Sequence, residues 1–185
     1  MFFALLLAGL AGAAQAAFDI DSLMSSLAQY KGGRARFVET RHLAVLDKPV
    51  VASGEMLYTA PDRLEKRTLQ PKPETMLLDK DVLSLERGKR KLTIQLSSRP
   101  EAQAFVDSIR STLAGNRAVL EQNYTLQLSG TAEQWVLTLV PKERKIATLL
   151  QRITVGGSRQ YVRSIEYLQA DGDRTELAIE PLDQP

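Results

Sequence analysis

The stretch Arg63–Ser97, RLEKRTLQPKPETMLLDKDVLSLERGKRKLTIQLS, decides the fold class. Short runs of β-prone residues alternate there with turns at Pro71-Lys72-Pro73, Asp79-Lys80-Asp81 and Arg87-Gly88-Lys89. Alternation of period two indicates strands, and connections this short join antiparallel neighbours because a parallel pair needs a long crossover. The stretch therefore predicts an antiparallel β-meander with strands at 63–70, 74–79, 82–87 and 91–97.

The same pattern continues on both sides, so the chain is predicted to be mostly β with helices, in the α+β class. Asp171-Gly172 predicts a further hairpin, because both residues tolerate positive φ. A sheet of about eleven strands must cover its apolar faces. This requirement favours a strongly curved antiparallel sheet or incomplete β-barrel, with helices on its concave face and room for a cavity. The further strands are expected at 34–43, 51–59, 123–129, 134–140, 151–156, 160–169 and 174–180.

A first helix is predicted ahead of the strands. Apolar residues recur there at i, i+3, i+4 and i+7, while Ser and Gln occupy much of the opposite face. Asp19 is the expected N-cap, and Gly32-Gly33 is the expected stop because glycine accepts the left-handed conformation that ends helices. The residues of the apolar face are Ile20, Leu23, Met24 and Leu27.

A second helical segment interrupts the strands. Ser98 and Glu101 have capping-box spacing across Pro100, which a first turn tolerates. Asp107 and Arg110 are expected on the polar face, and Gly115-Asn116 at the end, with a further turn at 117–122. The apolar face is expected to consist of Ala102, Phe105, Val106, Ile109 and Leu113.

The N-terminal residues Met1–Ala16, MFFALLLAGLAGAAQA, predict a signal peptide. An apolar run ends at Ala14-Gln15-Ala16, the small-x-small pattern after which signal peptidase cuts. Residues 17–185 are then expected to form a single soluble domain without cysteine, present as a monomer in the periplasm. With a formal net charge of +2, bulk charge gives no indication of a nucleic-acid partner.

Residues for catalysis or metal binding are sparse. The sequence has one histidine, His42, and no cysteine, so one chain cannot build a zinc or copper site of the usual N/S type. The pairs Asp79/Asp81 and Asp171/Asp173 lie in expected turns, where Asp is favoured for local hydrogen bonds. We therefore expect no enzyme, no cofactor and no metal. A hydrolase alternative requires a serine and an acid near His42.

The basic run Arg87–Lys91 has two interpretations. It is either a solvated hairpin tip with Gly88 at its centre, or a surface that docks an acidic partner or anionic lipid headgroups.

Several motifs resemble the periplasmic lipoprotein carriers of the LolA/LolB family. The resemblance covers essentially all of residues 17–185, with the motifs in matching order and spacing, and it identifies the chain as a divergent LolA-related member. Glu39 stands at the Gln position of the family's F-x-Q strand. The matching segments are Arg36–Glu39, Gly54–Tyr58 with Ala60-Pro61, Leu69–Pro71 with Met76–Asp79, Trp135–Thr138 with Pro141-Lys142, and Ile165–Tyr167 with Asp171–Asp173.

The resemblance implies an incomplete barrel, closed by a helical lid over an apolar cavity that takes the acyl chains of a lipoprotein. Its partners would be an inner-membrane ABC transporter and an outer-membrane acceptor. Two further positions depart from the family pattern. Ala60 replaces the arginine thought to latch the lid, a role for which Arg63 and Arg67 are the nearby candidates, and Lys66 replaces an aromatic residue facing the cavity. These departures suggest a specialised relative that carries a glycolipid or another lipid-linked product.

The sequence thus predicts a periplasmic lipid carrier. The alternative is a non-enzymatic envelope interaction protein with a filled core, acting through its surface. Strand alternation does not say which apolar face holds ligand and which packs on a helix, so each candidate has a core position as its alternative. The candidate cavity residues are Phe37, Leu57, Leu64, Met76, Leu78, Leu83, Leu85, Ile94, Phe105, Val106, Ile109, Leu126, Trp135 and Leu137.

Overall fold

The computed structural model describes residues 18–183, in which eleven antiparallel strands form one sheet. The prediction of about eleven strands is confirmed, and the strand bounds agree to within two residues. The predicted signal peptide lies outside the described residues. The strands are β1 (Gly32–His42), β2 (Val50–Thr59), β3 (Arg63–Gln70), β4 (Glu74–Asp79), β5 (Val82–Arg87), β6 (Arg90–Gln95), β7 (Tyr124–Gly130), β8 (Trp135–Pro141), β9 (Leu150–Ser158), β10 (Tyr161–Gln169) and β11 (Arg174–Pro181).

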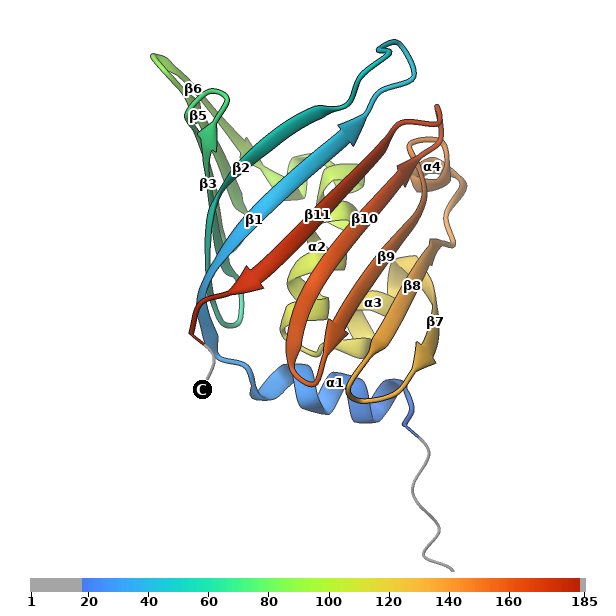
Figure 1. The fold of residues 1–185 in the computed structure, drawn as a ribbon. Helices are drawn as coiled ribbons and strands as arrows, with labels where there is room; N and C mark the ends of the chain where they lie inside the picture. Colours follow the sequence, from blue (N-terminus) through green and yellow to red (C-terminus); the bar gives the residue numbers. More distant parts are fainter. Residues whose placement is uncertain (1–17, 184–185) are drawn as a thin grey trace, which may run out of the picture.

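Two meanders make up the sheet, in the order β6-β5-β4-β3-β2-β1-β11-β10-β9-β8-β7. The first and last strands join them, with Phe37 opposite Ile179 in the register. Strands β6 and β7 are the two unpaired edges, so the barrel does not close. Figure 1 shows the resulting strong curvature, with β3–β6 turned nearly edge-on to a view that faces β1 and β8–β11. The predicted curved sheet or incomplete barrel is therefore confirmed.

The first helix lies at one end of the sheet, the second and third lie on its concave side, and the fourth lies at the opposite end (Figure 1). The first helix crosses the end where β1 starts, and the second and third lie behind the sheet as drawn. None of the helices in residues 18–183 is long and apolar enough to cross a membrane. Their bounds are α1 (Ile20–Gln29), the 3-10 turn η1 (Leu96–Ser98), α2 (Pro100–Leu113), α3 (Arg117–Asn123) and α4 (Arg144–Ala147).

The helix ends follow the sequence only in part. The Asp19 carboxylate accepts a hydrogen bond from the Ser22 amide at 2.8 Å, so the predicted N-cap of α1 is confirmed. The predicted glycine stop is wrong, because α1 already ends at Gln29 with Tyr30 in an extended conformation. Gly32 instead opens β1 at φ +137°, where an added Cβ would lie 2.3 Å from the Tyr58 carbonyl oxygen.

The predicted capping box of α2 is also wrong. The helix begins at Pro100 with Arg99 as its N-cap, which places Glu101 one residue too early for a capping box. The Ser98 hydroxyl ends η1 by donating to the Gln95 carbonyl at 2.7 Å. The end at Gly115 is confirmed, with φ +66°, and so is the further turn, which is α3. Helix α4 has only four residues, too few to show a helical period in the sequence.

A solid core fills the space between strands β7–β10 and the helices α1 and α3. We call these strands and helices the filled half of the molecule. The Trp135 side chain is completely buried, and its indole N–H donates to the Arg159 carbonyl at 2.9 Å. A Cβ at Gly157 would lie 2.2 Å from the Trp135 ring, so this glycine lets the indole lie flat against β9. The fully buried aliphatic residues of this core are Leu23, Leu27, Leu120, Leu137, Leu139, Ile153 and Val155.

Candidate ligand-binding cavity

A cavity of about 1270 Å³ lies between α2 and the concave face of the sheet. Its walls come from β1–β6, from β10 and β11, and from α2 with the α4 segment. Pockets for small molecules usually measure about 300–1,000 Å³, so this volume suits a larger or longer occupant. We call β1–β6 with α2 the hollow half of the molecule.

The helix α2 turns its apolar face toward this cavity. Its residues Ala102, Phe105, Val106, Ile109 and Leu113 all line the cavity, and Phe105 remains 39 % exposed. An amphipathic helix ordinarily packs such a face into a core. The orientation of α2 therefore leaves an apolar surface facing open space.

The buried face of α2 is instead small and polar: it comprises Ala104, Asp107, Ser108, Ser111 and Thr112. Hydroxyl groups on this face are satisfied within the helix, since the Ser108 hydroxyl donates to the Phe105 carbonyl and the Thr112 hydroxyl to the Ser108 carbonyl, both at 2.6 Å. The Tyr124 hydroxyl at the start of β7 donates to the Ala104 carbonyl at 3.2 Å. The prediction that Asp107 and Arg110 share one polar face is wrong, because Asp107 lies on this buried face whereas Arg110 lines the cavity. The two side chains form an ion pair.

Eight of the fourteen candidate residues line the cavity. Strands β3–β6 supply five of them, and the apolar face of α2 supplies three. These two groups face each other across the cavity, as a helix lid over a curved sheet requires. They are Leu64, Met76, Leu78, Leu83, Ile94, Phe105, Val106 and Ile109.

Three of the other candidates belong to the filled half and not to the cavity wall. Trp135 and Leu137 are completely buried in the core, and Leu126 packs against that core. The alternation of β7 and β8 predicts their inward face correctly. It does not reveal that α1 and α3 cover this part of the sheet and exclude a ligand.

The remaining three candidates do not line the cavity, each for a local reason. Leu57 points outward and is 39 % exposed, because its neighbours Met56 and Tyr58 take the inward positions of β2. Phe37 faces inward but is covered by the Lys66 ammonium, which lies 4.7 Å from the ring centroid. Leu85 is half-buried between its strand neighbours Met76 and Leu92 and does not reach the cavity surface.

Sequence reasoning missed the wall formed by β10 and β11. Strand β11 pairs with β1 from the other end of the chain, so no local pattern indicates that its residues face the same cavity. The Tyr167 ring lies 4.9 Å from the Phe105 ring, which joins this wall to α2. The additional apolar lining residues here are Val162, Ile165, Tyr167, Leu177 and Ile179.

The profile of a family described as "Outer membrane lipoprotein carrier protein LolA-like" matches residues 11–180. The chain belongs to this LolA-like family. Family membership connects it with carriers of the bacterial cell envelope, which as a family bind lipids and are generally not enzymes. The sequence-based identification as a divergent LolA-related member is confirmed. A search of curated proteins finds no match.

The chain is also similar to solved structures at low sequence identity. The MucA/MucB complex of Pseudomonas aeruginosa contains a chain with a TM-score of 0.50 and 11% identity, covering 91% of this chain and 59% of that one. A LolA superfamily protein from Nitrosomonas europaea has a TM-score of 0.44 and 11% identity, and the match covers 91% of this chain and 96% of that one. A lipoprotein-sorting protein domain from Vibrio parahaemolyticus has a TM-score of 0.42 and 11% identity, and the match covers 90% of this chain and 92% of that one.

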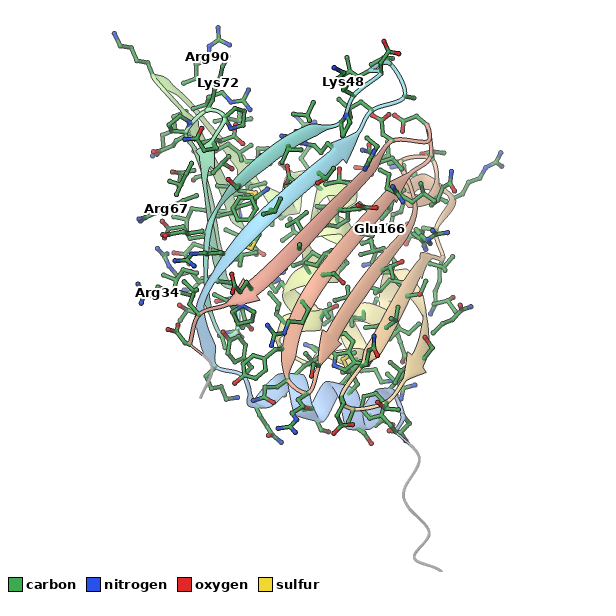
Figure 2. The ribbon with its side chains drawn as sticks, viewed as in Figure 1. Arg34, Lys48, Arg67, Lys72, Arg90 and Glu166 are labelled. Carbon is green, nitrogen blue, oxygen red and sulfur yellow. The ribbon has the colours of Figure 1, made fainter. Side chains whose placement is uncertain are left out.

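In this LolA-like chain, neither arginine near Ala60 reaches the lid within residues 18–183. Arg63 forms an ion pair with Asp79 at 2.7 Å, and Arg67 pairs with Glu65 and points away from the inner face (Figure 2). The lid itself carries the connecting arginine. Arg110 of α2 donates to the Lys80 carbonyl in the β4–β5 turn at 2.9 Å.

The two ends of α2 are held by further polar contacts. Arg110 also lies 3.7 Å from the Asp81 carboxylate, and the Leu96 amide of η1 donates to the Asp81 carbonyl at 2.8 Å. At the other side, Glu101 in the first turn pairs with Lys145 of α4 at 3.4 Å. These polar contacts connect α2 to the β4–β5 turn and to α4.

One charged cluster interrupts the cavity wall; we call Glu39, Arg41 and Lys66 the charged triad. The Arg41 Nε atom lies 3.0 Å from one Glu39 carboxylate oxygen, and the Lys66 ammonium pairs with the other. The side chains of Glu39 and Lys66 are only 9% and 16% exposed, so this is a largely buried ion pair. Burial, and secondarily the Glu39 charge, raises the pKa of the neighbouring Tyr167 phenol. Glu39 and Lys66 are also two positions at which the chain departs from the family pattern.

The other sequence features lie outside the cavity or at its mouth. His42 ends β1, as predicted, with its Nε2 atom 4.0 Å from Glu176, and it does not line the cavity. Asp81, Asp171 and Asp173 lie in the connections between strands, as predicted, whereas Asp79 is the last residue of β4. The Asp171 carboxylate accepts a hydrogen bond from the Asp173 amide at 3.0 Å. The basic run forms the β5–β6 tip around Gly88, and Figure 2 shows Arg90 extending from it.

Proposed function

We propose that this protein is a periplasmic carrier that shields the acyl chains of a lipoprotein or other lipid-linked cargo in the cavity between α2 and the sheet. Transfer would run between the inner and outer membranes. An inner-membrane transporter would load the carrier, and an outer-membrane acceptor would unload it. Residues 1–16 would act as the signal peptide, and residues 17–185 as a monomeric carrier domain without catalytic activity.

The observation that carries the proposal is the apolar face of α2 over an unfilled volume of about 1270 Å³. Each methylene removed from water gains about 0.8 kcal/mol, so an acyl chain is a large enough ligand to hold the lid closed. The same volume argues against the alternative of an envelope interaction protein, because that alternative requires a core filled by side chains.

Native mass spectrometry tests the proposal directly. The protein is purified from its own periplasm without detergent, and bound mass is extracted as lipid. We expect an acylated species. If the protein carries no such species and added acyl ligand neither binds nor raises the melting temperature, the carrier function is wrong.

A matched pair of variants assigns the binding to the cavity. Phe105 and Leu57 are equally exposed at 39 %, but only Phe105 lines the cavity. We expect Phe105→Glu to weaken binding of an acyl ligand by at least about a hundredfold, since a carboxylate there would have to be desolvated beside the chain. Leu57→Glu on the outer face should bind as the wild type does. Equal binding by both variants would remove α2 from the site.

A further inference from the structure

The charged triad is an unexpected feature of a cavity that is otherwise suited to hydrocarbon. Burying an ion pair costs desolvation free energy that its Coulomb attraction only partly offsets, and apolar replacements of buried pairs are often neutral or stabilising. Glu39 and Lys66 are both largely buried, and both line the cavity. Stability alone therefore gives no reason for this pair, which directs attention to the ligand.

The strand registers place a third donor beside the triad. Arg41 is opposite Thr175 on β11, and Thr175 is opposite Tyr167 on β10, so Arg41 and Tyr167 face the cavity at the same level. The Tyr167 ring in turn contacts Phe105 on α2. The polar cluster therefore adjoins the apolar face of the lid.

Hydrogen-bond donors exceed acceptors in this cluster. A lysine offers about three N–H donors, an arginine about five and a tyrosine one O–H, against roughly four acceptor sites on a single carboxylate. The triad of Glu39, Arg41 and Lys66 also keeps a net positive charge, and Arg41 is 44% exposed. A ligand group that brings negatively charged oxygens would match both the surplus donors and the charge.

Positive charge also predominates over the cavity as a whole. Of its charged lining residues in the described chain, seven are Lys or Arg and four are Asp or Glu. Two of these four acids form ion pairs, Glu74 with Arg87 and Glu101 with Lys145. Two of the seven cations are paired with acids outside the lining, Arg63 with Asp79 and Arg110 with Asp107. An anionic ligand is therefore favoured by the field of the cavity as well as by the triad.

We propose that the cavity selects anionic acyl lipids, with a phosphate or carboxylate group held by Arg41 and Lys66 and the acyl chain lying along the apolar face of α2. The proposal rests on the carrier function above and specifies its cargo class. A neutral acyl chain placed across the triad would displace the water that hydrogen-bonds to these ions, and it would offer no hydrogen bonds in return. An acyl chain that carries an anionic group replaces the lost hydrogen bonds with its own oxygen acceptors.

Displacement of a fluorescent fatty-acid probe by ligands of one chain length measures this selectivity. Hexadecyl phosphate and hexadecanoate supply the anionic groups, and hexadecanol supplies the same chain without charge. We expect the purified wild-type protein to bind the two anionic ligands about tenfold more tightly than the alcohol, since a hydrogen bond to a charged group supplies that difference.

Two substitutions in the triad move the selectivity in opposite directions. Arg41→Gln removes a cation and should lower the preference for anionic ligands toward unity. Glu39→Gln keeps the shape but raises the net charge, so it should increase the preference by several fold. The selectivity of each variant is the ratio of its affinities for the anionic ligands and for hexadecanol, and the melting temperature of each free variant checks that it is folded.

The outcomes separate the two proposals. Equal affinity for hexadecanol and the anionic ligands, or the same selectivity in both variants, overturns the anionic-cargo inference and leaves the carrier function standing. Failure of all three ligands to displace the probe overturns both. Inorganic phosphate provides the remaining arm: if it competes as well as hexadecyl phosphate, the triad binds a free anion and the assignment to a lipid headgroup is wrong.

Discussion

The filled and hollow halves of the sheet are built from the same kind of strand but enclose different interiors. In the filled half, α1 and α3 lie against the inward residues of β7–β10, and side chains such as Leu137 and Ile153 are completely buried. In the hollow half, inward residues such as Leu64, Met76 and Leu83 face α2 across a cavity and stay half-buried. Strand alternation therefore creates an inward face, and the helix above it decides whether that face becomes core or binding surface.

The distinction follows from how each helix presents its side chains. Helix α1 inserts large residues, Leu23, Met24 and Leu27, into the core. Helix α2 buries a small, hydroxyl-rich face around Ser108 and Thr112 and leaves its large residues toward the cavity. The filled half provides the rigid wall, and the hollow half provides the volume that a ligand can occupy.

The largest expected effect compares two leucines. Leu137 in β8 is completely buried, whereas Leu83 in β5 is half-buried against the cavity. Leu137→Ala leaves a void in a packed core and should lower the free energy of unfolding by about 2–5 kcal/mol. Leu83→Ala only enlarges an existing space and should cost about 1 kcal/mol or less. Urea unfolding of both variants measures the difference, and equal losses would mean that the hollow half is packed like the filled half.

A smaller effect concerns the contact between α2 and the β4–β5 turn. Arg110→Gln removes the hydrogen bond to the Lys80 carbonyl and the ion pairs with Asp107 and Asp81. A charge-assisted bond contributes about 1.5–3 kcal/mol, so we expect bound acyl ligand to dissociate roughly tenfold faster. Stopped-flow displacement of a fluorescent acyl probe measures this rate.

Arg63→Gln is the matched control for that experiment. Arg63 pairs with Asp79 on the strand beside it, with both side chains at least 40% exposed, so its loss should change stability little. It should accelerate ligand dissociation far less than the loss of Arg110 does. If the two variants release ligand at the same rate, the contact of Arg110 with the turn does not control the lid.

Much of this fold could be predicted from the sequence because its signals are local. Proline and glycine in the turns fix the hairpins, and period-two alternation fixes the strands between them. The pairing of β1 with β11 has no such signal, since it joins residues such as Phe37 and Ile179 from opposite ends of the chain. The cavity wall of β10 and β11 depends on that pairing and was missed for the same reason.

The candidate site was predicted less completely, for reasons that particular residues make clear. Met56, Leu57 and Tyr58 are all apolar, so alternation alone cannot choose the inward pair. Trp135 and Leu137 face inward as expected, but a distant helix, α1, turns their position into core. The ion pair of Glu39 with Lys66 joins strands that are not neighbours, and no sequence spacing indicates it.

The smallest effect appears only in alkaline solution and distinguishes one tyrosine from each half. Burial raises the pKa of both Tyr124, in the filled half, and Tyr58, which lines the cavity, to about 12. Their neutral phenols stabilise the folded state fully below pH 10, the ordinary pKa in the unfolded chain, and this stabilisation is lost as the pH rises from 10 through 12. Melting temperatures of wild type, Tyr124→Phe and Tyr58→Phe across that range measure each contribution.

Acyl ligand should separate these two contributions, because it displaces water from the cavity beside Tyr58 but changes nothing around Tyr124. With ligand bound, ionising Tyr58 becomes more costly, so Tyr58→Phe should remove a larger share of the alkaline loss of stability than it does without ligand. The effect of Tyr124→Phe should be the same with and without ligand, since the Tyr124 hydroxyl bonds to the Ala104 carbonyl on the packed side of α2. If ligand alters the Tyr124 contribution as much as that of Tyr58, binding repacks the filled half, and the division into a rigid wall and a ligand-bearing half no longer holds.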